Sequence, residues 1–233
     1  MAYLSDVAMV AADTSRTRVY LAALIKNDVL PSFVIVLENR EGSLLPGQTL
    51  TNGNTISELE EILAAAHILY VRAPSKDIND PGVINEILGR PETVFVYSGY
   101  GGVLVGKNVL ATGKRFLHVH GGYLPDFKGS TTNYFSLLAE NSMGASAIFL
   151  TEQIDSGPVI CRRKFPPPAK REHIDHLVDS ELRAEVLIET LRNFQRTGEW
   201  SYDLEENSGG ETYYVIHPLL KHISILSGEA SKR

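Results

Sequence analysis

Short apolar runs alternate with amphipathic segments through the first half of the chain. Residues 33–37 read FVIVL, a continuous β-branched run that is typical of a strand covered on both faces. The amphipathic segments between such runs carry apolar residues at helical spacing and begin at polar caps. The pattern predicts strands at residues 7–11, 33–37, 68–71, 93–97 and 117–120, and helices at residues 16–26, 57–66 and 80–88.

This alternation predicts βαβ units, which build a parallel sheet through right-handed crossovers. Ser57 and Glu60 have the spacing of a capping box, which favours a helix beginning there. Residues 38–55 are polar, contain several Gly and Asn, and are expected to form a loop. Ligands bind at the carboxyl ends of parallel strands, so the end of the 117–120 strand is a place to look for chemistry.

The pattern changes after residue 120. We expect a helix over residues 130–140, strands over residues 144–150 and 157–165, and one long amphipathic helix over residues 171–196 after a Pro-Pro-Pro break. An aromatic-containing tail follows Gly198 and is too short to be an independent second domain. The expected organisation is a catalytic domain over residues 1–197 and a tail over residues 198–233 that packs on the domain or in a dimer interface.

Composition narrows the class of protein. The chain is 43% apolar and 21% charged with a net charge of −6, which argues against a dedicated nucleic-acid binder. No apolar run is long enough to cross a bilayer, and the N-terminus lacks the basic start of a signal peptide. The single cysteine, Cys161, cannot form an internal disulfide. We therefore expect a cytoplasmic protein without a membrane or nucleic-acid partner.

The motif HVHGGYLPDFKG places two histidines at the end of a predicted strand. Residues two apart on a strand point to the same face, so His118 and His120 are expected to face one pocket. Gly121 and Gly122 follow, and we interpret them as leaving room for the close approach of a ligand. A half-buried strand with two structural histidines would give the same pattern.

The motif EQIDSGPVI places Asp155 in a turn between two predicted strands. Such a turn is often only a connection. Asp155 therefore has to be considered together with the two histidines. The same three side chains are also the ingredients of a metal site with two histidines and one carboxylate.

The two motifs together resemble the folate-dependent formyltransferase family, which includes the glycinamide ribonucleotide, methionyl-tRNA and sugar N-formyltransferases. The family pattern is Asn-x-His before a Leu-Pro loop, followed about 35 residues later by an Asp in an Ile-Asp-x-Gly turn. Here the interval from His120 to Asp155 is 35 positions. The resemblance covers roughly residues 7–196, and it implies a Rossmann-like, mostly parallel sheet flanked by helices and continuing into antiparallel strands. The chain departs from the pattern at His118, where the family has Asn.

The resemblance implies the reaction and the donor. It implies transfer of a formyl group from 10-formyltetrahydrofolate to an amine. His120 and Asp155 match the family's catalytic His and Asp, and His118 takes the place of the oxyanion-stabilising Asn by position alone. An imidazole can donate a hydrogen bond there if its tautomer is suitable. By position, the folate pocket would include Tyr97, Ser98, Gly99, Tyr100, Gly101, Leu104, Thr151 and Ile154.

The acceptor is narrowed by comparison with the family. Residues 11–19 read AADTSRTRV, without the glycines of the phosphate loop in the ribonucleotide enzymes. The tail is too short for the C-terminal domain of the tRNA enzymes. A small-molecule amine, with a nucleotide-linked amino sugar as the leading candidate, is therefore expected. A basic stretch over residues 162–171 is a candidate pyrophosphate contact, although a solvated basic loop would look the same.

Three alternative functions stay open. The first is a metal-dependent enzyme that uses His118, His120 and Asp155 as ligands. The second is a family member that binds folate without transferring anything, which the histidine at position 118 would explain. The third is a formyltetrahydrofolate hydrolase. A homodimer formed through the C-terminal tail is a further expectation, because this segment is rich in apolar residues.

Overall fold

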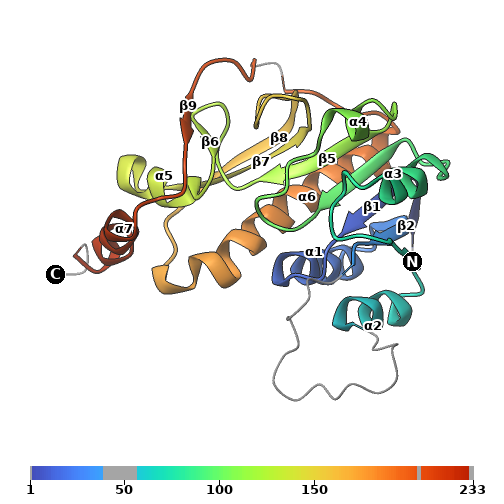
Figure 1. Cartoon of the computed structure of the whole chain (residues 1–233). Helices are drawn as coiled ribbons and strands as arrows, with labels where there is room; N and C mark the ends of the chain where they lie inside the picture. Colours follow the sequence, from blue (N-terminus) through green and yellow to red (C-terminus); the bar gives the residue numbers. More distant parts are fainter. Residues whose placement is uncertain (1, 39–56, 204–205, 231–233) are drawn as a thin grey trace. The chain divides into compact units, whose positions relative to one another are not determined.

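The computed structural model describes residues 2–38, 57–203 and 206–230. The chain divides into two compact units, Met1–Phe116 and Leu117–Arg233 (Figure 1). Each unit has its own buried core, and each is described by itself.

The first unit is built on four parallel strands. They are β1 (Tyr3–Ala11), β2 (Leu30–Val36), β3 (Leu69–Arg72) and β4 (Val94–Ser98), in the order β3-β2-β1-β4. Residues 7–11 of the central strand β1 are fully buried, as expected for a strand with neighbours on both edges. The helices of this unit are α1 (Ser15–Lys26), α2 (Glu58–Ala65), α3 (Pro81–Leu88) and α4 (Lys107–Leu110).

The predicted strands and helices of the first unit are confirmed to within a few residues, apart from the short α4, which was not predicted. Their caps explain why they begin where they do. Ser57 accepts from the backbone N–H of Glu60 while the Glu60 carboxylate accepts from the N–H of Ser57, so the capping box forms as expected. The predicted loop over residues 38–55 lies outside the described residues except for Glu38.

The second unit contains an antiparallel arrangement. Strand β5 (Arg115–His120) pairs with β7 (Met143–Phe149), which pairs with β8 (Val159–Phe165). Helix α5 (Thr132–Glu140) and helix α6 (Asp179–Thr197) pack on β7, and α6 also packs on β8. The parallel strands of the first unit and the antiparallel strands of the second, flanked by helices, confirm the predicted fold class.

The helix predicted over residues 171–196 is interrupted. It consists of a 3₁₀ turn, η1 (Arg171–His173), a π-helical segment, η2 (Ile174–Val178), and then α6. The side chains at its beginning explain the irregularity, because they are engaged elsewhere. Arg171 is buried and donates to the carbonyl of Ser224, and Asp175 accepts from the Tyr134 hydroxyl at 2.8 Å.

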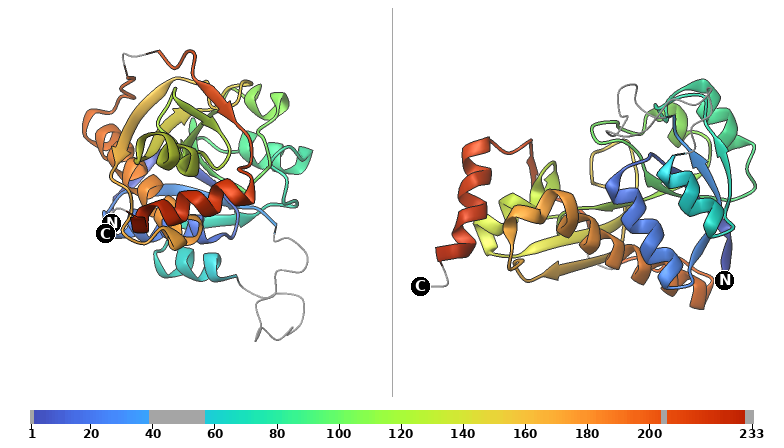
Figure 2. Two further views of the ribbon diagram at one scale, coloured as in Figure 1. Left: turned by 90° about the vertical axis from the view of Figure 1, so that its left-hand side faces the viewer. Right: turned by 90° about the horizontal axis from the view of Figure 1, so that it is seen from below.

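The C-terminal tail contributes elements that sequence periodicity did not predict. Strand β9 (Glu211–Tyr213) pairs in parallel with the short strand β6 (Phe127–Gly129). Helix α7 (Pro218–Ala230) packs against α5 and η1 (Figures 1 and 2). The Trp200 ring stacks on Phe194 with centroids 4.2 Å apart. The tail thus packs extensively on the second unit.

Helix α7 has an inverted distribution of polar and apolar side chains. Ser224 is fully buried and donates to the carbonyl of Tyr134 at 3.3 Å. The apolar side chains instead point outward and are 42–60% exposed. We call these exposed residues the apolar α7 face: Leu219, Leu220, Ile223 and Leu226.

None of the helices in the described parts of the chain combines the length and the apolar character needed to cross a membrane.

Candidate active site

His120 lies at the end of β5 and is almost completely buried. It pairs in register with Ser146 of β7. Its Nε2 atom lies 2.7 Å from the carbonyl oxygen of Phe127, and its Nδ1 atom lies 3.3 Å from Oδ2 of Asp155. The strand end therefore brings together His120 and Asp155, which are far apart in the sequence.

The Gly-Gly pair after His120 serves the protein's own packing. A Cβ on Gly122 would lie 2.5 Å from the carbonyl oxygen of Phe127 and 2.6 Å from Nε2 of His120. A Cβ on Gly121 would collide with the side chains of Arg183 and Asp179. At both glycines, the protein itself fills the space that a side chain would occupy. The interpretation that this space is left for a ligand is therefore wrong.

Asp155 sits in a tight turn and is held by backbone contacts. Its φ is 49°, in the left-handed region that Asp adopts more readily than most residues. Its Oδ2 accepts from the backbone N–H of Gly129 at 2.8 Å, in addition to facing His120. Its carbonyl oxygen accepts from the Asn207 side chain, also at 2.8 Å.

The hydrogen bonds of His120 define its proton arrangement. A carbonyl oxygen only accepts, so the contact with Phe127 requires a proton on Nε2. Burial lowers the pKa of His120, and although the Asp155 carboxylate acts in the opposite direction, the neutral form is favoured. In that form Nδ1 carries a lone pair that faces Oδ2 of Asp155. Two proton acceptors 3.3 Å apart form a site that can take up and share one proton.

His118 lies two residues earlier on β5, opposite Ile148 of β7, and is half-buried. The alternation of a strand places it on the same face as His120. Of the two histidines it is the more accessible, which is the relation expected when an outer residue contacts a ligand and an inner residue supports it.

The geometry does not favour the metal interpretation. The proton on Nε2 of His120 removes that nitrogen as a ligand, and Nδ1 faces the Asp155 carboxylate directly. Within residues 2–38, 57–203 and 206–230, no group of three His, Cys, Asp or Glu side chains is arranged to hold a metal ion.

The segment predicted to hold the folate in the first unit follows β4. Ser98 is fully buried, with its hydroxyl 2.8 Å from that of Thr17, and the Tyr97 hydroxyl donates to the carbonyl of Val103 at 3.4 Å. Burial raises the pKa of Tyr97 to about 12, so the phenol stays protonated. A Cβ on Gly99 would overlap the Tyr97 ring, which explains a glycine there.

Further along this segment the side chains are more exposed. The Tyr100 hydroxyl donates to the carbonyl of Glu38 at 3.0 Å, and Asn79 donates to the carbonyl of Leu104 at 2.9 Å. Leu104 is 64% exposed, and a Cβ on Gly101 would meet nothing within 4 Å. The loop is therefore fixed at its ends and presents open, apolar positions.

The other predicted folate contacts belong to the second unit. Thr151 donates to the carbonyl of Gln153 at 3.2 Å, which tightens the turn before Asp155. Ile154, next to Asp155, is 49% exposed. A large exposed aliphatic side chain beside a buried carboxylate is a suitable contact for an aromatic ring system.

The basic stretch over residues 162–171 does not form an open phosphate site. Arg162 pairs with Asp203 at 2.9 Å, Arg163 pairs with Glu185 at 2.5 Å, and Lys164 pairs with Glu140 at 2.8 Å. Arg171 is buried against α7. Because these charges are neutralised or enclosed within the second unit, the suggested pyrophosphate contact is not supported.

Several residues around the site were missed by the sequence reasoning. Ser146 donates to the carbonyl of Gly122 and accepts from the N–H of Leu124, both within 3.0 Å, and so holds the loop after His120. Lys128 and Asn207 contact the Asp155 turn. Lys128 lies inside the motif HVHGGYLPDFKG, so its place near the site could have been predicted from the sequence. Asn207 lies in the tail, and nothing in the local sequence connects it to Asp155.

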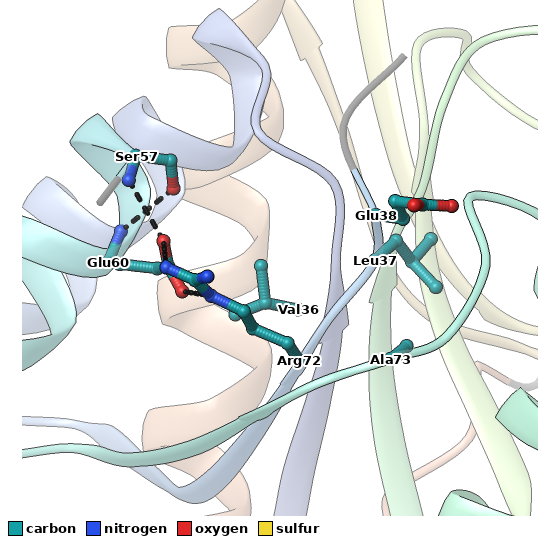
Figure 3. Close-up of a pocket in the computed structure, with 7 residues that line it drawn as sticks. All are labelled: Val36, Leu37, Glu38, Ser57, Glu60, Arg72 and Ala73. Atoms are coloured by element: carbon teal, nitrogen blue, oxygen red, sulfur yellow. Dashed lines mark hydrogen bonds and ion pairs between the residues drawn. The ribbon is translucent and has the colours of Figure 1, made fainter. Parts of the chain in front are cut away.

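A separate pocket of about 240 Å³ lies at the carboxyl ends of β2 and β3 in the first unit (Figure 3). Its polar groups contact one another. Arg72 pairs with Glu60 at 2.5 Å, and Glu60 is also bonded to Ser57 (Figure 3). The pocket is smaller than most small-molecule sites, and the Glu60 carboxylate in it is already satisfied by internal partners.

Comparison with known proteins agrees with this geometry. The formyl transferase family model matches residues 7–187. Methionyl-tRNA formyltransferase from Synechococcus sp. strain JA-2-3B'a(2-13) is 26% identical over 163 residues, covering 69% of this chain and 49% of the relative. The same enzyme from Listeria welshimeri is 26% identical over 114 residues, covering 48% of this chain and 36% of the relative. The chain thus spans half or less of the length of these relatives.

Solved structures share the fold. A 4-N formyltransferase from Francisella tularensis matches with a TM-score of 0.61 and 13% identity over 96% of this chain and 88% of that one. A sugar N-formyltransferase from Shewanella sp. matches with a TM-score of 0.59 and 12% identity over 97% of this chain and 88% of that one. Fold, site and family match define the class of protein: a formyltransferase-type α/β protein. The chain belongs to the formyl transferase family.

Proposed function

We propose that this protein transfers a formyl group from 10-formyltetrahydrofolate to the amine of a small molecule. The observation that carries the proposal is the contact between His120 and Asp155, 35 positions apart in the sequence and 3.3 Å apart in the fold. Both residues lie within the part of the chain that matches the family.

The proposed reaction begins with attack of the acceptor nitrogen on the formyl carbon. A tetrahedral intermediate forms, the bond from that carbon to N10 of the folate breaks, and the formylated amine leaves. The nitrogen of the acceptor must lose one proton, and N10 must gain one. Asp155 receives the proton in this scheme, because its Oδ2 faces an imidazole nitrogen with which the proton can be shared. Neutral His120 favours this uptake.

The two histidines stabilise the oxyanion in the proposed mechanism. His118 occupies the position of the family's Asn and is the more exposed of the two. For His120 to contribute, its Nε2–H must exchange the carbonyl of Phe127 for the oxyanion. A hydrogen bond to a charged oxygen is stronger than one to a neutral carbonyl, which favours that exchange.

Two segments are proposed to contact the donor, the segment after β4 in the first unit and the turn before Asp155 in the second, and each is considered by itself. The fixed loop ends and exposed apolar positions at Leu104 and Ile154 support this assignment.

The acceptor is proposed to be a nucleotide-linked amino sugar. The N-terminus of α1 supports excluding a phosphoribosyl acceptor, because Thr14 already caps it by accepting from the N–H of Thr17 at 3.2 Å. Sugar N-formyltransferases are among the structures that share the fold. Methionyl-tRNA is the competing acceptor, because the relatives described above are named methionyl-tRNA formyltransferases.

The experiment is a formyl-transfer assay with 10-formyltetrahydrofolate and a panel of amines, including nucleotide-linked amino sugars and methionyl-tRNA. Formylation of a nucleotide-linked amino sugar supports both the proposed reaction and the proposed acceptor. Formylation of methionyl-tRNA alone would overturn the acceptor. Release of formate without an acceptor would indicate a hydrolase, and folate binding without any turnover would indicate a binding protein. His118→Asn, which restores the family residue, is expected to retain transfer, whereas His118→Ala is expected to lose about 10²–10³ in rate.

We also propose that two copies associate through the apolar α7 face. The spacing along α7 is that of a helix–helix interface, with intervals of four and three residues between Leu219, Ile223 and Leu226. Leu alternates with the β-branched Ile in this series. Exposed Tyr214 and Val215 lie next to this face in the sequence. Lys221 is paired with Asp175, so the face is apolar apart from His222. A second copy supplies a matching apolar face at equal concentration, which supports self-association.

Sedimentation over a range of concentrations tests the homodimer. The intact chain is expected to have twice the monomer mass, and Ile223→Glu is expected to be a monomer. Leu69→Glu is the matched control, because Leu69 is also an exposed aliphatic residue but lies on β3 of the first unit. A monomeric intact chain, or a dimer that survives Ile223→Glu, would contradict the proposal.

A further inference from the structure

The turn that carries Asp155 is gripped by one side chain from the tail. Nδ2 of Asn207 donates to the carbonyl oxygen of Asp155 and to that of Gly157, both at 2.8 Å. One amide group thus bridges the two ends of a three-residue turn. Asn207 lies beyond residues 7–187, the part that matches the family.

Lys128 supports the same turn from β6. Its side chain is buried, and its ammonium lies 3.4 Å from the hydroxyl of Ser156 and 3.3 Å from the carbonyl oxygen of Asn207. Lys128 therefore joins β6, the middle of the Asp155 turn and the tail in one hydrogen-bonded group.

The neighbours of Lys128 on β6 contact the catalytic pair directly. Phe127 provides the carbonyl for Nε2 of His120, and Gly129 provides the N–H for Oδ2 of Asp155. Strand β6 is itself held by the tail, because it pairs with β9 and the N–H of Ser130 donates to the carbonyl of Tyr213 at 2.8 Å.

We infer that Asn207 and Lys128 are positioning residues, which hold the Asp155 carboxylate against His120 so that the C-terminal tail completes the active site. This inference rests on the proposed function for its effect on the reaction, but its structural content concerns the distance between two side chains. The Asn207 side chain bonds to backbone carbonyls of the turn, so any effect of this side chain on the reaction passes through Asp155.

The left-handed backbone of Asp155 explains why the turn needs such support. A residue other than glycine with φ near 49° is held in that conformation by its surroundings. Without the Asn207 amide, two carbonyl groups lose a donor, and the turn is expected to relax toward commoner backbone angles. The carboxylate would then move away from His120.

The titration of His120 reports this movement without any need for turnover. The charged groups that act on His120 are Asp155, Asp179 and Arg183. Asp155 is the largest of the charges that favour the protonated imidazole. Burial and the Arg183 charge lower the pKa of His120, and the Asp155 charge raises it. If Asp155 moves away, the pKa of His120 falls further.

The experiment follows the ring of His120 by NMR during a pH titration, with its signals assigned by comparison with His120→Asn. Asn207→Ala is expected to lower the midpoint of His120 by about half a unit or more. It is also expected to reduce kcat for formyl transfer about 10- to 100-fold with little change in KM for the folate. Asn193→Ala is the matched control, because Asn193 bonds only to groups of α6 and the adjacent turn.

Lys128→Met provides a second variant of similar length and is expected to move the His120 midpoint in the same direction. An unchanged midpoint in both folded variants would overturn the inference. The outcomes separate the two proposals. A shifted midpoint in a protein that formylates nothing would support the positioning role and reject the proposed function, whereas formyl transfer with unshifted midpoints would do the reverse.

Discussion

Gly122 occupies a point where the backbone of β6 and the ring of His120 leave no space for a side chain. An added Cβ would lie 2.5 Å from the carbonyl oxygen of Phe127 and 2.9 Å from the Thr132 hydroxyl. The contact between Nε2 of His120 and Phe127 depends on this close approach. The glycine thus sets the orientation of the imidazole that faces Asp155.

Gly122→Ala is therefore expected to displace β6 from His120. Overpacking of this kind costs about 1–3 kcal/mol of unfolding free energy, and formyl transfer should fall at the same time. Thermal unfolding and the transfer assay measure the two effects. Gly89→Ala is the control, since a Cβ there meets only ordinary contacts at 3.4 Å and beyond. Unchanged stability and activity in Gly122→Ala would show that the loop is looser than the structure indicates.

At the scale of elements, the attachment of α7 depends on one buried cation. Arg171 donates to the carbonyl of Ser224 at 2.9 Å, to the hydroxyl of Ser227 at 2.7 Å and to the side chain of Asn141 at 2.5 Å. Burial lowers the pKa of Arg171, but its guanidinium remains charged at neutral pH because its ordinary pKa is so high. Arg171 therefore links the start of the 171–197 segment to α7.

Arg171→Ala is expected to release α7 from the second unit. Hydrogen exchange in residues 218–227 should rise at least about tenfold, because local opening no longer has to break the two hydrogen bonds from Arg171 to Ser224 and Ser227. Lys170→Ala, next to it on the exposed surface, should leave exchange unchanged. Equal protection of α7 in Arg171→Ala and in the unaltered protein would show that apolar packing alone holds the helix.

The elements that the sequence predicted differ from those it missed in a physical way. The strand at residues 33–37 and the helix capped by Ser57 depend on local pattern and local hydrogen bonds, and both were found to within a few residues. Strands β6 and β9 are three residues each and exist only because distant segments pair. The interruption at η2 depends on Tyr134, which is 41 positions from Asp175. No periodicity contains such information.

For the candidate site the same distinction holds. His118, His120 and Asp155 lie in motifs with characteristic spacing, so they could be proposed from the sequence. Asn207 bonds to a residue 52 positions away and has no motif of its own. For the basic stretch over residues 162–171, the sequence could not decide between a pyrophosphate contact and a solvated loop, because its acidic partners, such as Glu185, are distant in the sequence.

At the scale of the whole molecule, the buried histidine predicts how stability depends on pH. Burial lowers the pKa of His120 below its ordinary 6.5, so the unfolded chain binds a proton more readily than the folded chain. The stabilisation is therefore complete above about pH 6.5 and is lost as the pH falls through the folded pKa. Burial raises the pKa values of Glu60 and Glu92, but the hydrogen bonds of these carboxylates lower them further. Their contribution to stability is therefore lost only at more acidic pH, below about 4.5.

Unfolding midpoints measured between pH 7.5 and 5 test this expectation. The unaltered chain should lose stability as the pH falls through 6.5, and His120→Asn should show a flatter dependence in the same range. A slope that persists in His120→Asn would assign it to other groups.

The Asp155→Asn variant shows whether the paired His120 and Asp155 transfer a formyl group. Asparagine can retain the hydrogen bond from the N–H of Gly129, which lies 2.8 Å from Oδ2, but it cannot take up a proton. The measurement is kcat/KM for formylation of the acceptor amine by 10-formyltetrahydrofolate, compared between the variant and the unaltered protein. A loss of about 10²–10⁴ in kcat/KM is expected. An Asp155→Asn variant that transfers the formyl group at the original rate would contradict it.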